Sequence, residues 1–419
     1  MFLHNREELQ NLRKEAEERL HAAKLRVLVC AGTGCIASGS KEIYDKMKEL
    51  SEGNGQVSVE FEGEVPHPEI RKSGCHGFCE MGPLMRIEPL GILYIKVKVE
   101  DCEEIYEKTI CQGQPIERLL YHKDGQVYQS EEAIPFYAGQ MRLVLKNCGH
   151  IDAENIEEYI AVGGYSALEK VLFDIDKDTA LDMMEESGLR GRGGGGFPAG
   201  RKWKQVARQK ETQRYVVCNG DEGDPGAFMD RSIMEGDPHK MLEGMLIGSY
   251  LTGAQNAYIY VRAEYPLAVE RLQKAIAQAE EYGLIGDNVL GTDFCIHFHI
   301  NRGAGAFVCG EGSALTASIE GKRGMPRVKP PRTVEQGLFA KPTVLNNVET
   351  YANVPMIITN GVEWYRSIGT EGSPGTKAFA LTGNVNNTGL IEVPMGTTLR
   401  TIIYDIGGGL KGEIGRAHV

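Results

Sequence analysis

Two close pairs of cysteines constrain the fold of this 419-residue chain more than any other feature. Cys30 and Cys35 have the spacing C-x4-C, and Cys75 and Cys79 have the spacing C-x3-C. Each pair lies in a glycine-containing loop beside an expected strand. Two such loops can supply four thiolates to one iron–sulfur cluster, and small neighbours let backbone N–H groups approach the sulfurs. A fold that uses all four must therefore bring both loops together.

Other interpretations of the cysteines stay open at this point. A structural zinc ion accepts C-x2–4-C spacing, which the second pair satisfies, and buried free thiols need no ligand. Disulfides are disfavoured because the charged start of the chain contains no signal-peptide core. The remaining six of the 10 cysteines are isolated, and we expect them to pack in cores: Cys102, Cys111, Cys148, Cys218, Cys295 and Cys309.

The composition argues against several classes of protein. Hydrophobic residues make up 42% of the chain and charged residues 25%, which permits a large core and argues against wholesale disorder. A net charge of −12 argues against broad nucleic-acid binding, which needs clustered Lys and Arg. No apolar run approaches the roughly 18–20 residues that span a bilayer. We therefore expect a cytoplasmic protein without membrane insertion.

The N-terminal part of the sequence predicts a small α/β unit of thioredoxin-like size that ends near residue 120. A first helix over 6–24 is heavily charged and is expected to be a solvated lead-in. Further helices are expected over 40–50 and 101–111, strands over 25–29, 57–61, 84–87 and 92–99, and a loop over 66–83.

The rest of the chain alternates helices and strands, which predicts a layered α/β domain after a connector that contains the turn signal Asp124-Gly125. The expected strands are 215–218, 257–261 and 294–300, and the expected helices are 153–162, 166–172, 179–187, 266–281 and 313–320. Residues 322–332 are expected to form an ordered surface loop. From Gly375 a new pattern begins, with strands at 378–381 and 390–394 and a helix at 399–406.

A glycine-rich segment, Gly188–Pro198, precedes an expected helix. Successive glycines let main-chain N–H groups face a phosphate, and the following helix N-terminus adds a positive dipole. Arg190, Arg192, Phe197 and Lys202 would add phosphate contacts and a stacking face. Because a helix rather than a strand is expected before the segment, it is not a Rossmann fingerprint. A flexible glycine linker is the alternative.

Three further segments are ambiguous when each is taken alone. Residues 219–228 (Asn-Gly-Asp-Glu-Gly-Asp-Pro-Gly-Ala-Phe) follow a strand, and their carboxylates could bind a metal, orient a polar ring or be solvated. Residues 301–313 join a strand to a helix. In 341–350, the amides of Asn346 and Asn347 suit the edges of an aromatic heterocycle or a helix cap.

In this order the four segments resemble the FMN- and NADH-binding subunit of respiratory complex I and its hydrogenase relatives, from about Ile134 to the end. The cysteine pairs resemble the 2Fe–2S ferredoxin domain of NADH dehydrogenase and hydrogenase subunits. Residues 25–40 are especially similar to the flavin-bearing subunit of NAD(P)-linked iron-only hydrogenases. The implied domains are thioredoxin-like 2Fe–2S (1–120), connector (121–150), Rossmann-like FMN- and NAD(P)H-binding (151–365) and partial β-grasp-like (366–412).

The resemblance also implies the site residues. The cysteines Cys30, Cys35, Cys75 and Cys79 would hold a 2Fe–2S cluster. Flavin contacts are implied for Gly191, Gly193, Lys202, Asn219, Asp221, Glu222, Gly310, Glu311, Leu345, Asn346, Asn347 and Thr350. Positions near the dinucleotide are implied for Gly194, Gly195, Phe197, Lys202, Asp224 and Phe307. We add Arg192 and Gly196 from the glycine-rich segment to the expected cofactor-binding set.

The implied activity is that of an NAD(P)H dehydrogenase, with hydride exchange between NAD(P)H and FMN and single electrons passed to iron–sulfur clusters. Glu222 is the expected catalytic residue, because its charge would orient the rings and tune the flavin potential. The implied partners are a hydrogenase catalytic subunit, a small 2Fe–2S subunit and, where electrons are bifurcated, ferredoxin. The alternatives are a diaphorase subunit of complex I or of an NAD-dependent formate dehydrogenase, and a non-catalytic iron–sulfur docking scaffold.

Three departures from the complex I pattern are expected to matter. Gly312 stands where a glutamate is usual, and Lys204 and Gln205 stand where an aromatic residue is usual after the Lys-Trp pair. Arg332 follows Pro330-Pro331 where a phenylalanine is usual, which leaves NAD and NADP both open. The 4Fe–4S motif of the relatives would follow residue 412. Residues 413–419 fit neither the family nor a helix end, resemble a translated sequencing adapter, and are expected to be artefactual.

Overall fold

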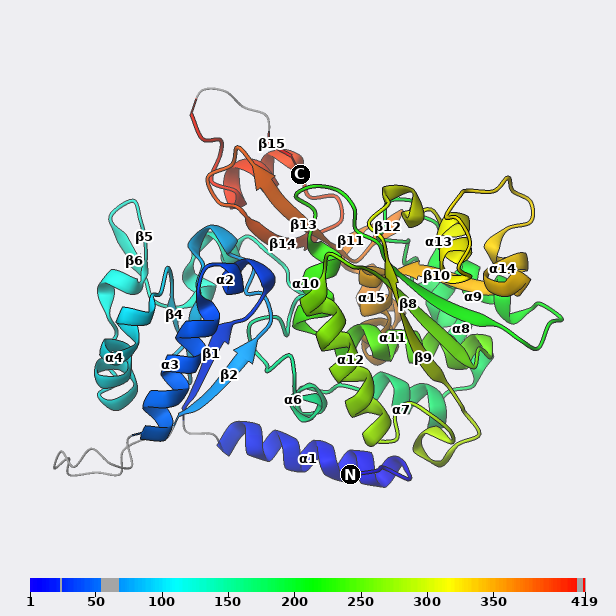
Figure 1. Cartoon of the computed structure of the whole chain (residues 1–419), viewed down its shortest axis with the longest axis horizontal. Helices are drawn as coiled ribbons and strands as arrows, with labels where there is room; N and C mark the ends of the chain where they lie inside the picture. The colour runs from blue at the N-terminus through cyan, green and yellow to red at the C-terminus, as the bar shows by residue number, and fades with distance from the viewer. Residues whose placement is uncertain (23–24, 54–67, 413–416, 419) are drawn as a thin grey trace.

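The computed structural model describes residues 1–22, 25–53, 68–412 and 417–418 and shows a mixed α/β protein with several separate sheets. Figure 1 shows a small N-terminal sheet beside a larger central sheet, with a C-terminal strand pair at the top of the view. Within the described residues, no helix combines the length and the apolar character that a membrane crossing requires.

The N-terminal sheet has the strand order β2-β1-β3-β4. Its strands are β1 (Arg26–Cys30), β2 (Glu69–Ser73), β3 (Met85–Glu88) and β4 (Ile92–Tyr94). The central strand β1 is buried along its whole length and pairs in parallel with β2 and antiparallel with β3. The strands predicted at 25–29 and 84–87 are confirmed, and the one predicted at 92–99 is confirmed in shortened form.

The strand β2 corrects the sequence analysis, which predicts a loop over 66–83. Its sequence Glu-Ile-Arg-Lys-Ser is mostly polar, and most of its side chains are only partly buried. This is typical of a strand at the edge of a sheet, where no clear alternation of apolar and polar residues is required. The strand predicted at 57–61 lies outside the described residues.

The central sheet is wholly parallel, with the strand order β10-β7-β8-β9. Its strands are β7 (Tyr215–Gly220), β8 (Asn256–Arg262), β9 (His297–Gly303) and β10 (Thr343–Asn347). The register places Asn347 beside Asn219, so β7 and β10 end at the same edge of the sheet. The strands predicted over 215–218, 257–261 and 294–300 are confirmed, although the third begins later than predicted.

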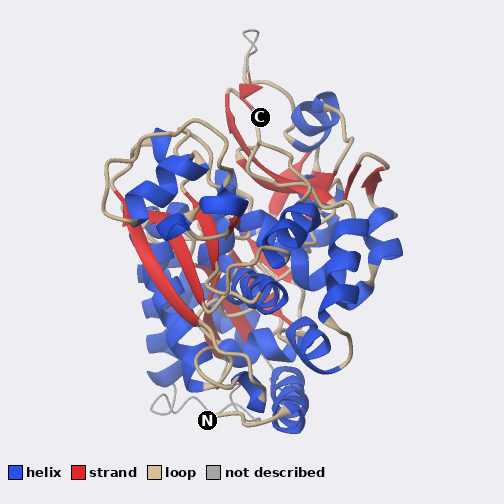
Figure 2. Cartoon of the chain, turned by 90° about the vertical axis from the view of Figure 1, so that its right-hand side faces the viewer, coloured by secondary structure: helices blue, strands red, loops and turns tan. Residues whose placement is uncertain are grey.

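Helices lie on both sides of the central strands (Figure 2). They are α6 (Ile156–Ala161), α7 (Ser166–Phe173), α8 (Lys177–Glu186), α9 (Ala199–Ala207), α10 (Met229–Gly236), α11 (Pro238–Thr252), α12 (Pro266–Glu281), α13 (Gly312–Ile319), α14 (Thr333–Gln336), α15 (Val348–Asn360) and α16 (Val362–Arg366). The five helices predicted over 153–162, 166–172, 179–187, 266–281 and 313–320 are confirmed. Residues 322–332 form neither helix nor strand, as predicted.

The N-terminal sheet and the connector carry shorter elements. They are α2 (Thr33–Ala37), α3 (Ser40–Gly53), α4 (Cys102–Glu104), a helical continuation (Ile105–Cys111), β5 (Tyr121–Lys123), β6 (Gln126–Tyr128) and α5 (Pro135–Ala138). The helices predicted over 40–50 and 101–111 are confirmed. The turn predicted at Asp124-Gly125 joins β5 to β6, and both of its residues have positive φ.

Helix α1 (Arg6–Ala22) is not the solvated lead-in that its charge predicts. Leu9 and Leu12 are 0% and 3% exposed, and the helix packs against α6. Arg6 and Arg13 form ion pairs of 2.7 and 3.0 Å with the same carboxylate, that of Glu169. The apolar stripe is narrow, so it is easily overlooked among the charged residues, but it is enough to dock the helix.

The C-terminal strands β13 (Thr376–Gly383) and β14 (Gly389–Pro394) form an antiparallel pair, as predicted. A short β15 (Ala417–His418) pairs with the end of β13, and β11 (Gly369–Thr370) pairs with β12 (Ser373–Pro374). The predicted helix is present as a helical turn, Thr401–Ile406. One hydrophobic cluster joins this part of the chain to the N-terminal sheet: Cys30, Cys35, Phe78, Leu84, Leu93, Phe136, Leu381, Ile391, Val393, Ile402 and Ile406.

The isolated cysteines do not all pack in cores. Cys102, Cys148, Cys218 and Cys309 are buried as predicted. Cys111, by contrast, is exposed, and Cys295 is partly exposed, so the prediction is wrong for these two residues. A single exposed apolar side chain is common on protein surfaces.

Candidate functional site

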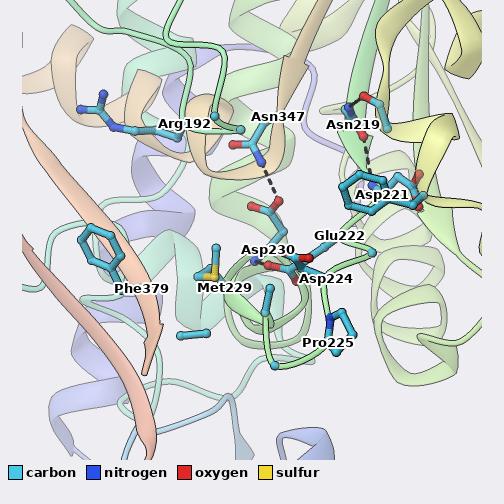
Figure 3. A pocket seen from close by; sticks show the side chains of 18 of the residues that line it. Arg192, Asn219, Asp221, Glu222, Asp224, Pro225, Met229, Asp230, Asn347 and Phe379 are labelled. Atoms are coloured by element: carbon cyan, nitrogen blue, oxygen red, sulfur yellow. Dashed lines mark hydrogen bonds between the residues drawn. The ribbon is translucent and has the colours of Figure 1, made fainter. Parts of the chain in front are cut away.

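A cavity of about 750 Å³ opens where β7 and β10 end, at the carboxyl edge of the central sheet (Figure 3). Ligands of parallel α/β sheets commonly bind at this edge. The walls come from all four sequence segments and from β13: Arg192, Gly193, Gly194, Asn219, Asp221, Glu222, Gly223, Asp224, Pro225, Gly226, Ala227, Met229, Asp230, Phe307, Val308, Gly310, Glu311, Asn347, Lys377, Phe379, Ala380 and Thr382. The size is within the usual range for a cofactor pocket.

The glycine-rich loop forms a cradle on one side of the cavity. The main-chain N–H of Arg192 donates a 2.9 Å hydrogen bond to the Thr350 hydroxyl, which fixes the loop to α15. A Cβ atom on Gly193 would lie 2.9 Å from the Cβ of Asn347, so only glycine fits there without a shift. By contrast, Gly194 and Gly195 face open space. Their backbone is therefore free to approach a ligand.

The side chain of Arg192, a predicted phosphate contact, makes its hydrogen bonds to protein groups. Its guanidinium points away from the cavity (Figure 3) and is almost completely buried. It donates to the carbonyls of Thr376 and Pro374 at 3.0 and 2.7 Å and to the Tyr365 hydroxyl at 3.2 Å. Arg192 thus connects the loop to the C-terminal strands, and only its backbone faces the cavity.

Lys202 lies behind the cavity wall and contacts the paired asparagines. Its ammonium group donates to the Leu345 carbonyl at 2.6 Å and to the Asn346 side-chain oxygen at 2.9 Å. Burial lowers the pKa of Lys202 to about 8. The Asn346 side-chain NH2 is buried and has no hydrogen-bond partner, so it has donor capacity left for a ligand.

Several predicted residues do not line this cavity. Phe197 is 43% exposed, and its ring centroid is 5.9 Å from the Lys202 ammonium. Its exposed face is available for stacking outside the cavity. The other predicted residues that are absent from the cavity walls, among those that the structure describes, are Gly191, Gly195, Gly196, Lys202, Leu345, Asn346 and Thr350.

The acidic segment after β7 brings Asn219 and Asp221 to the cavity. The Asn219 amide donates to the Gly310 carbonyl at 2.9 Å and accepts from the Asp221 N–H at 3.0 Å, which ties the acidic loop to the segment after β9. Burial raises the pKa of Asp221, and one of its carboxylate oxygens is buried without a partner. A Cβ atom on Gly310 would lie 3.6 Å from a carboxylate oxygen of Asp221, which is an ordinary van der Waals contact. Asp224 is exposed at the rim.

Glu222 and Asp230 form a pair of buried carboxylates beside the cavity. The two oxygens of Glu222 accept the N–H groups of Asp230 and Arg231 at 3.1 Å each, which caps the start of α10. Burial raises the pKa of Glu222 and, together with the Glu222 charge, raises that of Asp230 well above its ordinary value. Asp230 was not among the predicted residues, because in the sequence it resembles any acidic residue of a first helical turn.

Asn347 has two roles, one in a helix cap and one in the cavity wall. Asn347 caps α15 through a 3.2 Å hydrogen bond from the Thr350 N–H, so the capping alternative is confirmed for this residue. Its NH2 group also donates to the Asp230 carboxylate at 2.6 Å (Figure 3). The same side chain therefore holds a helix start and contributes to the cavity wall.

The segment after β9 contributes an exposed ring and a helix cap. Phe307 is 70% exposed at the cavity mouth, in a position to stack on a planar ligand. Glu311 caps α13 through the N–H groups of Ser313 and Ala314 at 2.8 and 3.1 Å. Although partial burial opposes it, the hydrogen bonds from Lys329, Ser313 and Ala314 lower the pKa of Glu311 to about 2.

The strand β13 closes the cavity opposite the acidic loop, which the sequence analysis did not predict. Phe379 faces the cavity from this strand (Figure 3), and Lys377 and Thr382 also line it. Lys377 forms an ion pair with Glu349 of α15, and the N–H of Ala378 donates to the same carboxylate at 2.9 Å. No sequence motif marks these residues, and only the fold brings this strand to the cavity.

The four paired cysteines meet in two loops next to the N-terminal sheet. Cys30 ends β1 and Cys35 lies in α2, whereas Cys75 follows β2. The Cys75 and Cys79 sulfurs are 4.0 Å apart. Side-chain hydrogen bonding of the Cys30 thiol with Cys35 and Cys75 raises the pKa of Cys30 well above its ordinary value, so the two pairs are in mutual contact.

Glycines leave space around these sulfurs. A Cβ atom on Gly82 would lie 2.8 Å from the Cys35 sulfur, and one on Gly32 would lie 3.0 Å from the Cys75 Cβ. This small-residue cradle fits a cluster held by four thiolates. In the described ranges, no group of three or more His, Cys, Asp or Glu side chains has the arrangement for holding one metal ion.

Two of the three departures from the expected family pattern, Gly312 and Arg332, have ordinary local roles. Gly312 is the first residue of α13. Arg332 is 55% exposed and pairs with Glu335 at 2.9 Å, one turn along α14. Its guanidinium would have to leave this ion pair to meet a nucleotide phosphate.

Comparison with known proteins identifies relatives of this chain. Residues 184–356 match the family model described as the Nuo51 FMN-binding domain. The chain is 55% identical over 270 residues to the NADP-reducing hydrogenase subunit HndC of Solidesulfovibrio fructosivorans, covering 64% of this chain and 55% of that one. It is 49% identical over 287 residues to an NADH-quinone oxidoreductase subunit of Aquifex aeolicus (strain VF5), covering 68% of this chain and 67% of that one.

A similar crystal structure covers almost the whole chain. It is that of an NAD+-reducing [NiFe]-hydrogenase in the H2-reduced state, with a TM-score of 0.57 and 26% identity over 97% of this chain and 67% of that one. The present chain thus spans only part of these relatives, just over half of the HndC protein.

Proposed function

Because this chain belongs to the Nuo51 FMN-binding family, we propose that it exchanges a hydride between NAD(P)H and FMN as a subunit of a hydrogenase-type complex. The observation that carries the proposal is the convergence of all four segments on one cavity. Each contributes at least one wall residue: Gly193, Asn219, Phe307 and Asn347. The high identity to HndC, which belongs to a hydrogenase, favours that setting over complex I or a formate dehydrogenase.

Residues at the cavity wall (Asp221 and Gly194) and directly beside the wall segments (Asn346 and Gly195) have features that suit a flavin. The unpartnered oxygen of Asp221 and the unpartnered NH2 of Asn346 could accept from and donate to the polar edge of a ring. The open backbone at Gly194 and Gly195 suits a phosphate. When bound, FMN would supply two-electron exchange with nicotinamide and one-electron exchange with iron–sulfur clusters.

Roles for the other residues follow from their positions. Glu222 would place a negative charge near the reacting rings, and Phe307 would stack on the dinucleotide at the mouth. Lys202 would act from behind the asparagines, through its charge. We also propose that Cys30, Cys35, Cys75 and Cys79 hold a 2Fe–2S cluster in a thioredoxin-like domain.

We propose the domain limits 1–120, 121–150, 151–365 and 366–412, with Rossmann-like and partial β-grasp-like folds for the last two. Steady-state kinetics with NADH and with NADPH would measure the preference between the two nucleotides. The proposed partners are a hydrogenase catalytic subunit and a small 2Fe–2S subunit, with ferredoxin in a bifurcating complex. The expected setting is the cytoplasm.

An inventory of cofactors after anaerobic expression of the chain tests the proposal. We expect bound FMN, a 2Fe–2S signal in electron paramagnetic resonance (EPR) that needs all four cysteines, and ferricyanide reduction by NADH or NADPH. Zinc in place of iron would refute the cluster. An iron–sulfur protein that binds no flavin would instead support the docking scaffold.

A glycine pair provides a matched control. Gly193→Ala places a Cβ against Asn347 and should lower FMN affinity at least tenfold. Gly372→Ala introduces the same methyl group where nothing lies within 4 Å, and it should leave FMN binding unchanged. Equal effects of the two substitutions would contradict the cavity as the flavin site.

A further inference from the structure

Helix α10 joins the proposed flavin cavity to the cysteine loops. Its first residues, Met229 and Asp230, line the cavity. Its last residues, Glu235 and Gly236, contact the two loops that carry the cysteines. A helix of 8 residues is about 12 Å long, so the two sites lie at opposite ends of one short rigid element.

The carboxylate of Glu235 is held by the first cysteine loop. It is 1% exposed, and it accepts the Thr33 N–H at 3.0 Å and the Thr33 hydroxyl as well. Thr33 lies between Cys30 and Cys35 in the sequence. The negative charge of Glu235 is therefore fixed against the loop that carries two of the four thiols.

Main-chain contacts keep both loops in place at this end of α10. Arg271, itself 2% exposed, donates to the main-chain carbonyl of Glu235 and, at 3.1 Å, to that of Ala31. On the second loop, a Cβ atom on Gly74 would lie only 2.2 Å from the Gly236 Cα. No side chain fits between these backbones.

The charge of Glu235 is only partly compensated. Among the described residues its one ion pair is with Arg231, and the distance from Nε to the carboxylate is 3.9 Å. Arg271 binds its carbonyl, not its carboxylate. Because the site is buried, a charge here acts on its surroundings with little solvent screening.

We propose that Glu235 is a positioning residue of the iron–sulfur cluster, which holds the first cysteine loop and lowers the reduction potential of the cluster through its charge. The inference rests on the proposed function, because it requires the 2Fe–2S cluster at the four cysteines. An electron added to the cluster would be repelled by the carboxylate, so the partly compensated charge makes reduction less favourable.

A redox titration of the full chain tests the charge. The chain is reconstituted anaerobically with iron and sulfide, and the cluster is followed by EPR. Glu235→Gln keeps an acceptor for the Thr33 N–H and removes the charge. We expect the equilibrium constant for reduction to rise about tenfold, which is a shift of about 59 mV for a one-electron couple.

A second buried carboxylate provides the control for loss of stability. Glu243 accepts main-chain N–H groups from Tyr165, Ala167 and Leu168 at 2.9 to 3.0 Å, but it lies on α11 and contacts neither cysteine loop. Glu243→Gln should lower thermal stability and leave the cluster potential unchanged. An equal shift of potential in both variants would overturn the proposal.

A variant of Thr33, the hydrogen-bond partner of Glu235, keeps the proposal testable if Glu235→Gln fails to fold. Thr33→Val removes only the hydroxyl donor, which leaves the Glu235 charge less neutralised and should lower the potential. A normal cluster whose potential does not move in these variants would refute the inference alone. A wild-type chain that binds no iron would refute the proposed function together with it.

Discussion

The side-chain amide of Asn347 donates a 2.6 Å hydrogen bond to the carboxylate of Asp230 beside the cavity. The bond joins the end of β10 to the first turn of α10, two elements that are far apart in the sequence. Burial, and then the nearby charge of Glu222, raise the pKa of Asp230 well above its ordinary value. This carboxylate is therefore easier to bury protonated than ionised.

The substitution Asp230→Asn tests the raised pKa of Asp230 in the cofactor-free protein. In the folded chain Asp230 keeps its proton to a higher pH than in the unfolded chain, where aspartate ionises near 4. Its contribution to stability is thus full at acidic pH and is lost as the pH rises through the raised pKa. We expect the variant to be more stable than wild type by about 1 kcal/mol at pH 8 and to lose this advantage toward pH 4. Calorimetry at several pH values measures the difference in stability between the variant and the wild type. A difference that does not change with pH would contradict the raised pKa of Asp230.

Arg192→Ala should act on stability more than on flavin affinity. The substitution leaves the carbonyls of Thr376 and Pro374 buried without their donor, which costs about 2–3 kcal/mol of unfolding free energy. Thermal unfolding and FMN titration at low temperature separate the two effects. Arg190→Ala, at an exposed neighbour, should change stability by less than about 0.5 kcal/mol. If the variant has normal stability but no longer binds FMN, the result would instead support a phosphate contact by Arg192.

Lys202 should make flavin binding depend on pH. Its pKa of about 8 means that its positive charge is present at pH 7 and is mostly gone at pH 9.5. Since FMN is anionic throughout this range, binding should weaken several-fold as the pH rises. Lys202→Met should bind FMN more weakly at pH 7 and show a nearly flat profile. Fluorescence titrations of both proteins provide the comparison, and parallel curves would rule out this role.

Glu222→Gln should raise the flavin reduction potential. The substitution removes a buried negative charge that disfavours a reduced, anionic flavin, while the amide oxygen can still cap α10. A shift of about 30 mV corresponds to a tenfold change in the two-electron equilibrium. Spectroelectrochemistry measures the potential, and steady-state kinetics with NADH and NADPH measure the preference. If potential, turnover and preference are all unchanged, Glu222 has no role beyond capping.

Much of the secondary structure could be predicted because its periodicity is local. The strands at β7 and β8 are short apolar runs, and α12 has a clear apolar face. Helix α11 gave no such signal. Nearly all of its residues are buried, so it has no polar face from which a helical period could be read.

The site could be predicted only where residues belong to a motif. Gly193, Asn219 and Asn347 come from segments whose chemistry is unusual enough to notice. Asp230 and Lys377 are ordinary charged residues in the sequence, and only the packing of α10 and β13 brings them to the cavity. The direction of the Arg192 side chain is likewise set by tertiary contacts.

The wall formed by β13 has a consequence for how the protein is assembled. Residues 184–356 match the FMN-binding family, whereas Lys377, Phe379 and Thr382 lie beyond them and still face the cavity. The bonds from Lys377 and Ala378 to Glu349 fasten this wall to α15. The matched segment alone therefore does not enclose the cavity, and the docked C-terminal strands complete its wall. A substitution that loosens the contacts of β13 with Glu349 would thus be expected to open the cavity without changing any of its wall residues in the matched segment.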